Sequence, residues 1–378
     1  MRVLHVSQPV DAGVARVVVD LVADQVARGW DVAVACPAEG WLPEAARKAG
    51  ARVAPWSATR SPGPRTVAEA QALSKIVDEF TPAVVHLHSA KAGLAGRLAV
   101  RGRLPTVFQP HAWSFEAVDG VMRVASQWWE RVGAGWSDLV VAVSDSERSR
   151  GGDAGIRTPV FVARNGVDPD RWRPGNRAAA RTSLGLGDGP LIVCVGRLTR
   201  QKGQDRLIAL WPEVRAAVPG ASLVLVGDGP DRTVLEAAAG PGVVFAGATD
   251  DPEPWYAAAD VVVVASRWEG MALVPLEAMA CERSVVATDV DGVRETLGLE
   301  AGAVVPADDG EALRAALVRR LTDPEMAGRE GRAGRARVVS WFNVWKTTAA
   351  VADAVERLVH ERRRPPALPE DLGTRRRA

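Results

Sequence analysis

The sequence predicts an α/β protein built from two Rossmann-like, parallel-sheet domains that face each other across a cleft. Short, β-branched apolar runs alternate with helical segments along most of the chain, and this alternation is typical of parallel sheets with crossover helices. A Pro- and Gly-rich stretch at residues 169–189 interrupts the alternation, which then starts again. The chain has 378 residues, too many for one ordinary hydrophobic core, so two domains are expected.

Seven strands and their connecting helices are expected before residue 169. The apolar runs that predict strands are residues 3–6, 31–35, 52–55, 84–87, 106–110, 139–143 and 160–163. Helices are expected near residues 14–28, 42–48, 67–80, 91–96 and 121–137. These elements make up an N-terminal domain at residues 1–168, and residues 169–189 are the expected linker.

The second half of the chain repeats the pattern. Strands are expected at residues 191–195, 223–226, 243–247, 261–265 and 285–288, and helices from residue 275, at 311–321 and at 341–359. We therefore expect a C-terminal domain at residues 190–340 and a closing helix at residues 341–360. The tail, residues 361–378, is rich in Pro and Arg and has too little apolar content to order itself, so we expect it to be disordered.

Composition limits the partners and the compartment. The net charge of +1 gives no electrostatic reason to expect a nucleic-acid partner. The three cysteines are far apart and lack metal-ligand spacing, which favours core residues in a reducing compartment. No run approaches the about eighteen apolar residues of a membrane span, so a cytoplasmic location is expected.

The amphipathic stretch at residues 121–137 leaves a membrane contact open. It contains Trp128, Trp129 and Trp136 beside arginines. Exposed indoles of this kind favour peripheral binding to the inner face of the membrane, whereas buried ones would be ordinary core aromatics.

The loop after strand 261–265 carries the first candidate site. Glu269 and Glu277 flank it, and the following helix is expected to start at Pro275, which places Glu277 in its first turn. Gly270 permits close backbone approach, and residues 270–273 lead into a helix N-terminus that favours an oxygen-rich or anionic ligand. The two carboxylates can converge on one small ligand, or they can be a dipole-complementing residue and a solvated charge.

Two cations follow strand 191–195. Arg197 and Lys202 lie in a loop ahead of a helix, at the carboxyl end of the strand, where ligands bind in open α/β sheets. A forked guanidinium and a mobile ammonium are the groups expected to neutralise a diphosphate. Solvated loop charges are the alternative.

Histidines and a glycine mark the N-terminal side. His86 and His88 lie on one face of a strand, but no third metal ligand is evident near them, so no metal is expected. His111 lies just past a strand end and is placed to donate to a ligand oxygen, with a packed loop histidine as the alternative. Gly13 either admits a substrate to the start of the next helix or makes a simple turn.

Two strings resemble the signatures of one enzyme family. Residues 269–280 read Glu-Gly-Met-Ala-Leu-Val-Pro-Leu-Glu-Ala-Met-Ala, and residues 196–203 read Gly-Arg-Leu-Thr-Arg-Gln-Lys-Gly. Both resemble the signatures of the family-4 retaining glycosyltransferases of GT-B fold. The resemblance covers nearly the whole chain and is strongest in the second half. Met271 and Ala272 stand where Phe and Gly are usual, and Pro275 lies one position late, which leaves the sugar open.

The resemblance implies a role for each candidate residue. Arg197 and Lys202 would hold the donor diphosphate and stabilise the leaving group, and Glu277 would accept the ribose hydroxyls. His111 would contact the sugar from the opposite domain, and His88 would line the acceptor side of the cleft. The sugar would be positioned by Glu269 and the backbone amides of Gly270, Met271, Ala272 and Leu273, near Gly13.

The resemblance also implies the reaction. The chain would transfer a sugar from a UDP- or GDP-linked donor to a carbohydrate or lipid-linked acceptor, in cell-surface polysaccharide or glycolipid synthesis. The family is metal-independent, so no cofactor is expected and the string at residues 289–291, Asp-Val-Asp, is not taken as a metal site. The alternatives are a GT-B nucleotide-sugar epimerase and a non-catalytic nucleotide-sugar-binding protein.

Overall fold

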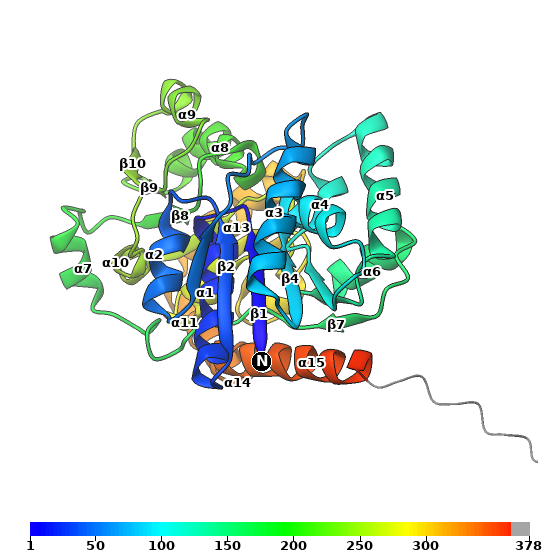
Figure 1. Ribbon diagram of the computed structural model, residues 1–378. Coiled ribbons are helices and arrows are strands. Elements are labelled where there is room, and N and C mark those ends of the chain that lie inside the picture. The colour runs from blue at the N-terminus through cyan, green and yellow to red at the C-terminus, as the bar shows by residue number, and fades with distance from the viewer. Residues whose placement is uncertain (364–378) are drawn as a thin grey trace, which may run out of the picture.

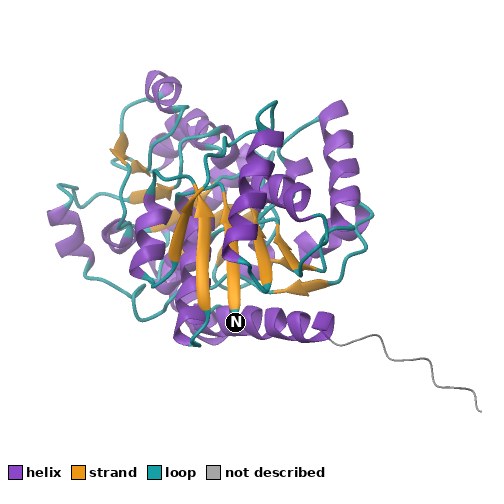
Figure 2. Cartoon of the chain, viewed as in Figure 1, coloured by secondary structure: helices purple, strands orange, loops and turns teal. Residues whose placement is uncertain are grey.

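The computed structural model describes residues 1–363 and contains two open parallel sheets (Figure 1). Helices surround the strands of both sheets (Figure 2). The first sheet draws on residues 2–162 and the second on residues 191–305. The predicted fold class, two parallel-sheet α/β domains, is confirmed.

The first sheet has seven strands in the order β3-β2-β1-β4-β5-β6-β7. Its strands are β1 (Arg2–Ser7), β2 (Asp31–Cys36), β3 (Arg52–Pro55), β4 (Val84–His88), β5 (Thr106–Gln109), β6 (Leu139–Ala142) and β7 (Val160–Val162). Its helices are α1 (Ala12–Ala27), α2 (Trp41–Lys48), α3 (Thr66–Phe80), α4 (Ser89–Val100), η1 (Ser114–Glu116), α5 (Gly120–Ala134) and α6 (Asp145–Asp153). The order reverses between β1 and β4, which is where ligands bind in such sheets.

The second sheet has six strands in the order β10-β9-β8-β11-β12-β13. Its strands are β8 (Leu191–Val195), β9 (Ser222–Val226), β10 (Val243–Gly247), β11 (Val261–Val264), β12 (Ser284–Thr288) and β13 (Gly302–Val305). The helices from α7 onward are α7 (Arg177–Ser183), η2 (Arg200–Lys202), α8 (Gln204–Ala217), α9 (Arg232–Ala238), α10 (Glu253–Ala258), α11 (Leu273–Ala280), α12 (Val293–Leu297), α13 (Gly310–Thr322), α14 (Pro324–Trp341) and α15 (Val344–Arg363).

Alternation of side chains places two helical layers on the first sheet. Leu4 and Val6 of β1 pack in one core cluster with Leu73 of α3. Val3 of the same strand points to the opposite face, where it packs with Leu21 of α1. Both faces of β1 are therefore buried, and the burial includes the polar side chains of His5 and Ser7.

The closing helix α15 packs against the first domain although it comes last in the described chain. Val351 and Val355 share a core cluster with Val3 and Leu21, and Arg28 of α1 donates to Asp353 at 2.7 Å. Figure 1 shows α15 lying beneath β1. Its apolar stripe thereby ties the end of the chain to the beginning.

Several element boundaries differ from the prediction. The expected linker contains helix α7, held by ion pairs from Arg177 and Arg181 to Asp260. The closing helix begins at Val344 and continues to Arg363, so residues 361–363 are helical rather than part of a disordered tail. Residues 364–378 of the expected tail lie outside the described residues. Helix α11 begins at Leu273, two residues before Pro275.

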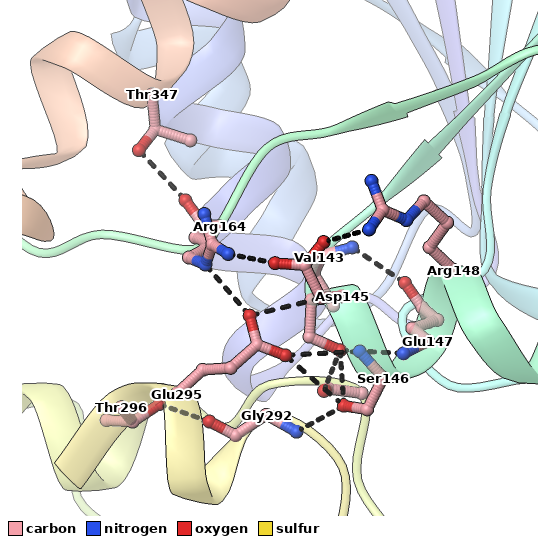
Figure 3. A network of polar contacts seen from close by, with 12 residues as sticks. Val143, Asp145, Ser146, Glu147, Arg148, Arg164, Gly292, Glu295, Thr296 and Thr347 are labelled. Atoms are coloured by element: carbon pink, nitrogen blue, oxygen red, sulfur yellow. Dashed lines mark hydrogen bonds and ion pairs between the residues drawn. The ribbon is translucent and has the colours of Figure 1, made fainter. Parts of the chain in front are cut away.

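A polar network joins the two domains (Figure 3). The carboxylate of Glu295, on α12, accepts from the backbone amides of Asp145 and Ser146 at the N-terminus of α6, both at 3.1 Å. Arg164 donates to the same carboxylate at 2.8 Å. Burial opposes ionisation, but these donors hold the pKa of Glu295 below its usual value. A charged residue of one domain thus caps a helix of the other.

Candidate functional site

The two signature loops of the second domain meet through one ion pair. Lys202 Nζ lies 2.6 Å from Glu269 Oε1, and Ser266 Oγ donates to the same oxygen at 2.7 Å. Glu269 is 8% exposed, so its charge is compensated inside the protein. The structure therefore places a predicted cation and a predicted carboxylate side by side, at the carboxyl ends of β8 and β11.

Glycines let these loops approach each other. Gly203 has a φ of 70°, and a Cβ there would lie 2.0 Å from the carbonyl oxygen of Ala265. Any larger residue would push the Lys202 loop away from β11. This packing is what brings Lys202 to Glu269.

Arg197 is half-buried beside the pair, and its guanidinium makes no hydrogen bond to another described residue. Burial lowers its pKa, and the charge of Arg60 lowers it further. Arg60 lies on a loop of the first domain, so a third cation faces this region. Sequence reasoning missed Arg60 because no motif surrounds it.

A buried ion pair fixes the loop that carries Arg60. Lys91 lies 2.5 Å from Glu69, and both are nearly inaccessible to solvent. Glu69 accepts from the Thr59 amide at 2.8 Å, and Lys91 donates to the carbonyl of Ser61 at 3.1 Å. The residues on either side of Arg60 are thus anchored to the protein interior.

The loop at residues 270–272 touches the first domain. A Cβ on Gly270 would lie 2.8 Å from the carbonyl carbon of His111 and 2.9 Å from the amide nitrogen of Ala112. Asn165 of the first domain donates to the Met271 carbonyl at 2.7 Å. The amides of residues 270–272 donate to no acceptor among residues 1–363. They remain available to an oxygen-rich ligand.

Glu277 is the fifth residue of α11 rather than a first-turn residue, because the helix begins at Leu273. Its Oε2 accepts from the hydroxyl of Tyr256 at 2.6 Å. Burial raises the pKa of Glu277, whereas the Tyr256 hydrogen bond lowers it. Tyr256, the one tyrosine of the sequence, was not predicted as a site residue because it lies on α10, away from every motif.

Gly13 lies in the first turn of α1 and faces the second domain. A Cβ at this position would lie 3.7 Å from Leu273 Cδ1. Gly13 therefore lies where α1 comes close to the start of α11. It belongs to a helix and not to a simple turn.

The loop that carries His111 is strained and tightly held. His111 has a φ of 58° and Ala112 a φ of 124°, both unusual for residues other than glycine. The Ala112 amide donates to Glu147 Oε1 at 2.8 Å, and the Trp113 indole donates to the Glu147 carbonyl at 2.7 Å. Such strain persists only where the surroundings over-determine the backbone.

His88 is fully buried, so it is not open to an acceptor in this structure. Its Nδ1 lies 3.1 Å from His111 Nε2, and its Nε2 lies 2.9 Å from His5 Nδ1. The packed, hydrogen-bonded alternative describes it better than a cleft-lining role.

The expectation that no third ligand lies near His86 and His88 was wrong. His5, on β1, completes a group whose ring nitrogens all lie within 4.8 Å of one another. A metal would have to displace hydrogen bonds here, since both ring nitrogens of His88 lie within hydrogen-bond distance of other histidines. Both nitrogens of His5 are also within hydrogen-bond distance of other side chains.

The carboxylates of the Asp-Val-Asp string make ion pairs. Asp289 accepts from Arg294 at 2.8 Å and 2.6 Å, and Asp291 lies 2.5 Å from Arg150 of the first domain. Each carboxylate has an arginine partner, and Asp291 belongs to the domain interface.

Comparison with known proteins supplies the family. The family described as Glycosyl transferases group 1 matches residues 189–323, and the one described as Glycosyltransferase Family 4 matches residues 12–171. A GDP-mannose-dependent alpha-(1-6)-phosphatidylinositol monomannoside mannosyltransferase of Mycobacterium tuberculosis is 34% identical over 328 residues, which cover 81% of this chain and 83% of that protein. The chain belongs to glycosyltransferase family 4.

Other relatives of this family-4 glycosyltransferase are named for products other than a mannoside. An alpha-maltose-1-phosphate synthase of Mycolicibacterium smegmatis is 33% identical over 309 residues, or 71% of this chain and 78% of that protein. Among solved structures, HepE of Anabaena in complex with UDP and glucose superposes with a TM-score of 0.81 at 21% identity, covering 94% of this chain and 99% of that one. This likeness confirms the GT-B fold.

Family membership makes this protein an enzyme of sugar transfer in glycolipid or polysaccharide synthesis, as predicted. Nothing in the comparisons favours an epimerase or a silent sugar-binding protein. Among residues 1–363, no helix combines the length and the apolar character needed to cross a bilayer.

Proposed function

We propose that this glycosyltransferase transfers mannose from GDP-mannose to a lipid-linked acceptor, with retention of configuration, at the inner face of a membrane. The contact between Lys202 and Glu269, with Arg197 beside it, is the observation on which the proposal depends. Two cations and a carboxylate from separate loops converge there, which suits a diphosphate joined to a sugar. Relatives named for GDP-mannose support the donor.

In this proposal each site residue has one task. Arg197 and Lys202 neutralise the charge that develops on the departing diphosphate, which is electrostatic stabilisation by preorganised donors. Glu269 and the amides of residues 270–273 position the sugar. Glu277 accepts the ribose hydroxyls, and His111 contacts the sugar from the first domain.

A donor panel tests the proposed nucleotide sugar. GDP-mannose should raise the melting temperature, because a ligand that binds only the folded state stabilises it. UDP-glucose and GDP-glucose at equal concentration serve as matched controls for base and sugar. Stabilisation by UDP-glucose alone would overturn GDP-mannose as the donor. Product formed without any added acceptor would instead favour epimerisation.

The acceptor side of the proposal depends on the outer face of α5. Val121, Val124 and Trp128 are 84%, 65% and 62% exposed on this helix, which lies at the edge of the molecule beside exposed Arg123 (Figure 1). Apolar and basic side chains on one exposed helix suit an anionic bilayer surface. Of the three predicted indoles, only Trp128 is exposed.

Helix α5 is also joined to the loop that carries His111. Ser114 Oγ, in η1, lies 2.7 Å from Ser126 Oγ and 2.7 Å from Glu130 Oε1, both on α5. A bilayer under α5 would therefore present a lipid-linked acceptor close to the proposed sugar site.

Sedimentation with vesicles tests the membrane contact. The wild-type protein should sediment with vesicles of anionic phospholipid and much less with zwitterionic ones. The double variant Val124→Glu, Trp128→Glu should lose most of this binding. Val234→Glu, on α9 of the other domain and 72% exposed in the wild type, is the matched control and should bind as the wild type does. Equal binding by all three proteins would remove α5 as the contact.

A further inference from the structure

Four buried or half-buried side chains form a continuous line from the interior of the first domain to His111. Gln25 Oε1, on α1, lies 2.8 Å from His5 Nε2. His5 Nδ1 lies 2.9 Å from His88 Nε2, and His88 Nδ1 lies 3.1 Å from His111 Nε2. His5 and His88 therefore each have a hydrogen-bond partner at both ring nitrogens, and the line ends at the proposed sugar site.

The sheet explains why these residues meet. His5 of β1 and His88 of β4 lie on neighbouring parallel strands, on the face that α1 covers. Gln25 comes from α1 itself, and His111 follows β5, the next strand. No local motif could have revealed the line, since its four members come from separate segments.

The rings are neutral, which gives each one donor and one acceptor. Burial lowers the pKa of His5 to about 4 and that of His111 to about 3. Burial also holds the pKa of His88 well below its usual value. In a line of neutral rings, the hydrogen bond at one end fixes the proton positions along the whole line.

We propose that Gln25, His5 and His88 are positioning residues that set the tautomer of His111 and make its Nδ1 a hydrogen-bond acceptor for a sugar hydroxyl. The amide oxygen of Gln25 accepts from His5 Nε2–H. His5 Nδ1 then accepts from His88 Nε2–H, and His88 Nδ1 accepts from His111 Nε2–H. The lone pair of His111 Nδ1 is left for the ligand.

This proposal differs from the sequence-based expectation that His111 donates to a ligand oxygen. If the Gln25 amide were turned so that its nitrogen faced His5, each ring in the line would carry its proton on Nδ1 instead of Nε2. The direction of donation along the line is therefore the point to test. His111, the last member of the line, has a strained backbone with a φ of 58°. The role toward a sugar rests on the proposed function, whereas the proton positions do not.

Nitrogen-15 NMR of the full-length protein, labelled at histidine, reads the tautomers without any activity assay. The sequence has five histidines, and exposed His360 on α15 serves as an internal reference. We expect His5, His88 and His111 each to carry the proton on Nε2. A proton on His111 Nδ1 overturns the proposal, whether or not the donor is GDP-mannose.

Two variants separate the line from ordinary packing. Gln25→Met removes the acceptor at the far end, and we expect the His111 nitrogen signals to move and the transfer rate to fall about tenfold, as for a lost hydrogen bond. His86→Phe is the matched control. His86 stacks on His88, and its ring centroid lies 5.2 Å from that of His5, but it makes no hydrogen bond to a member of the line.

The His86→Phe variant should leave the His111 signals and the rate within about twofold of wild type. If Gln25→Met leaves the His111 signals unchanged, the line does not set the tautomer. If both variants slow transfer equally with unmoved signals, the cluster is only core packing and the proposal fails. Folding of each variant is verified by its circular dichroism spectrum.

Discussion

Lys202 and Glu269 neutralise each other, and this bears on how the site can work. An isolated carboxylate with 8% exposure would be costly, so Lys202 stabilises the charge of Glu269. A diphosphate would compete with Glu269 for the ammonium, and Ser266 would still donate to the carboxylate. Glu269 would then be freer to accept from a sugar hydroxyl.

Lys202→Ala should cut kcat/KM at least about 100-fold, because a preorganised charge at the leaving group is lost. It should also lower the free energy of unfolding by about 2 kcal/mol, since the Glu269 charge keeps only Ser266 as a partner. Lys346→Ala, at an exposed position on α15, is the control and should change neither quantity. Near-normal turnover of Lys202→Ala would remove the residue from the phosphate site.

Glu277→Gln should weaken nucleoside diphosphate binding, because an amide has one acceptor oxygen where the carboxylate has two. Tyr256→Phe should have a smaller effect in the same direction, since the Tyr256 hydrogen bond lowers the pKa of Glu277. Isothermal titration calorimetry at constant pH measures the nucleoside diphosphate affinity of both variants. An affinity unchanged in Glu277→Gln would count against contact with the ribose.

The elements show what local sequence can and cannot predict. Strands such as β11, four valines, were evident from their apolar runs. Helix α11 begins before Pro275 because the first turn of a helix needs no acceptor for its amides, so proline is tolerated there. Strand β13 has the sequence Gly-Ala-Val-Val, in which only two of four residues are β-branched, so it gives no clear signal.

Helix α14 escaped prediction for a different reason. It packs through small residues rather than an apolar stripe. A Cβ on Gly331 would lie 2.1 Å from the carbonyl oxygen of Glu282, and one on Gly334 would lie 2.9 Å from Met279 Cγ. Close backbone packing of this kind leaves no hydrophobic periodicity to detect.

The candidate site also combines residues that the sequence reveals with residues that only the fold brings in. The loops at residues 196–203 and 266–280 were recognisable because their residues are contiguous. Arg60 and Tyr256 approach those loops only through the fold, and His5 reaches His88 in the same way. No spacing in one sequence could have joined them to the motifs.

Helix α6 offers a test of the domain contact, because its first amides are capped by Glu295 from the other domain. Glu295→Ala should leave both domains folded but shift the protein toward a more open arrangement, detected as a larger radius of gyration in X-ray scattering. Turnover should fall, because residues of both domains face the proposed sugar site. Asp289→Ala removes a carboxylate that pairs with Arg294 within one domain and should keep the wild-type radius. An unchanged radius in Glu295→Ala would show that the cap does not hold the domains together.

The two domains also meet at a group of carboxylates. Their ionisation depends on the contact between the domains. Glu116 of the first domain and Asp291 of the second share Arg150, at 3.1 Å and 2.5 Å. Burial, and then the charge of Asp291 across the interface, raise the pKa of Glu116 to about 8. The charge of buried Glu147 also raises the pKa of Glu116. The Trp113 amide donates to Glu116 at 3.2 Å.

Because the folded pKa of Glu116 lies above its usual 4.5, the folded, closed protein binds a proton that the unfolded chain releases. Its stabilising contribution is complete below pH 4.5 and is lost as the pH rises toward about 8. Asp20, with a pKa raised to about 7 mainly by burial, adds a loss of the same sign. Glu147, with a pKa also raised to about 7 by burial, acts in the same direction. The buried histidines, whose pKa values burial lowers, act in the opposite direction below their usual pKa of 6.5. The free energy of unfolding should therefore decrease as the pH rises from about 6.5 to about 8.

Glu116→Gln stays neutral at every pH, so it should remove part of this decrease, on the order of 2 kcal/mol, while the shares from Asp20 and Glu147 remain. Urea titrations at several pH values measure the slope in each protein. Glu39→Gln, at an exposed position, is the control and should keep the full wild-type slope. If Glu116→Gln and Glu39→Gln lose the same free energy across that range, Glu116 is already ionised in the closed protein, and the charge of Asp291 does not reach it across the interface.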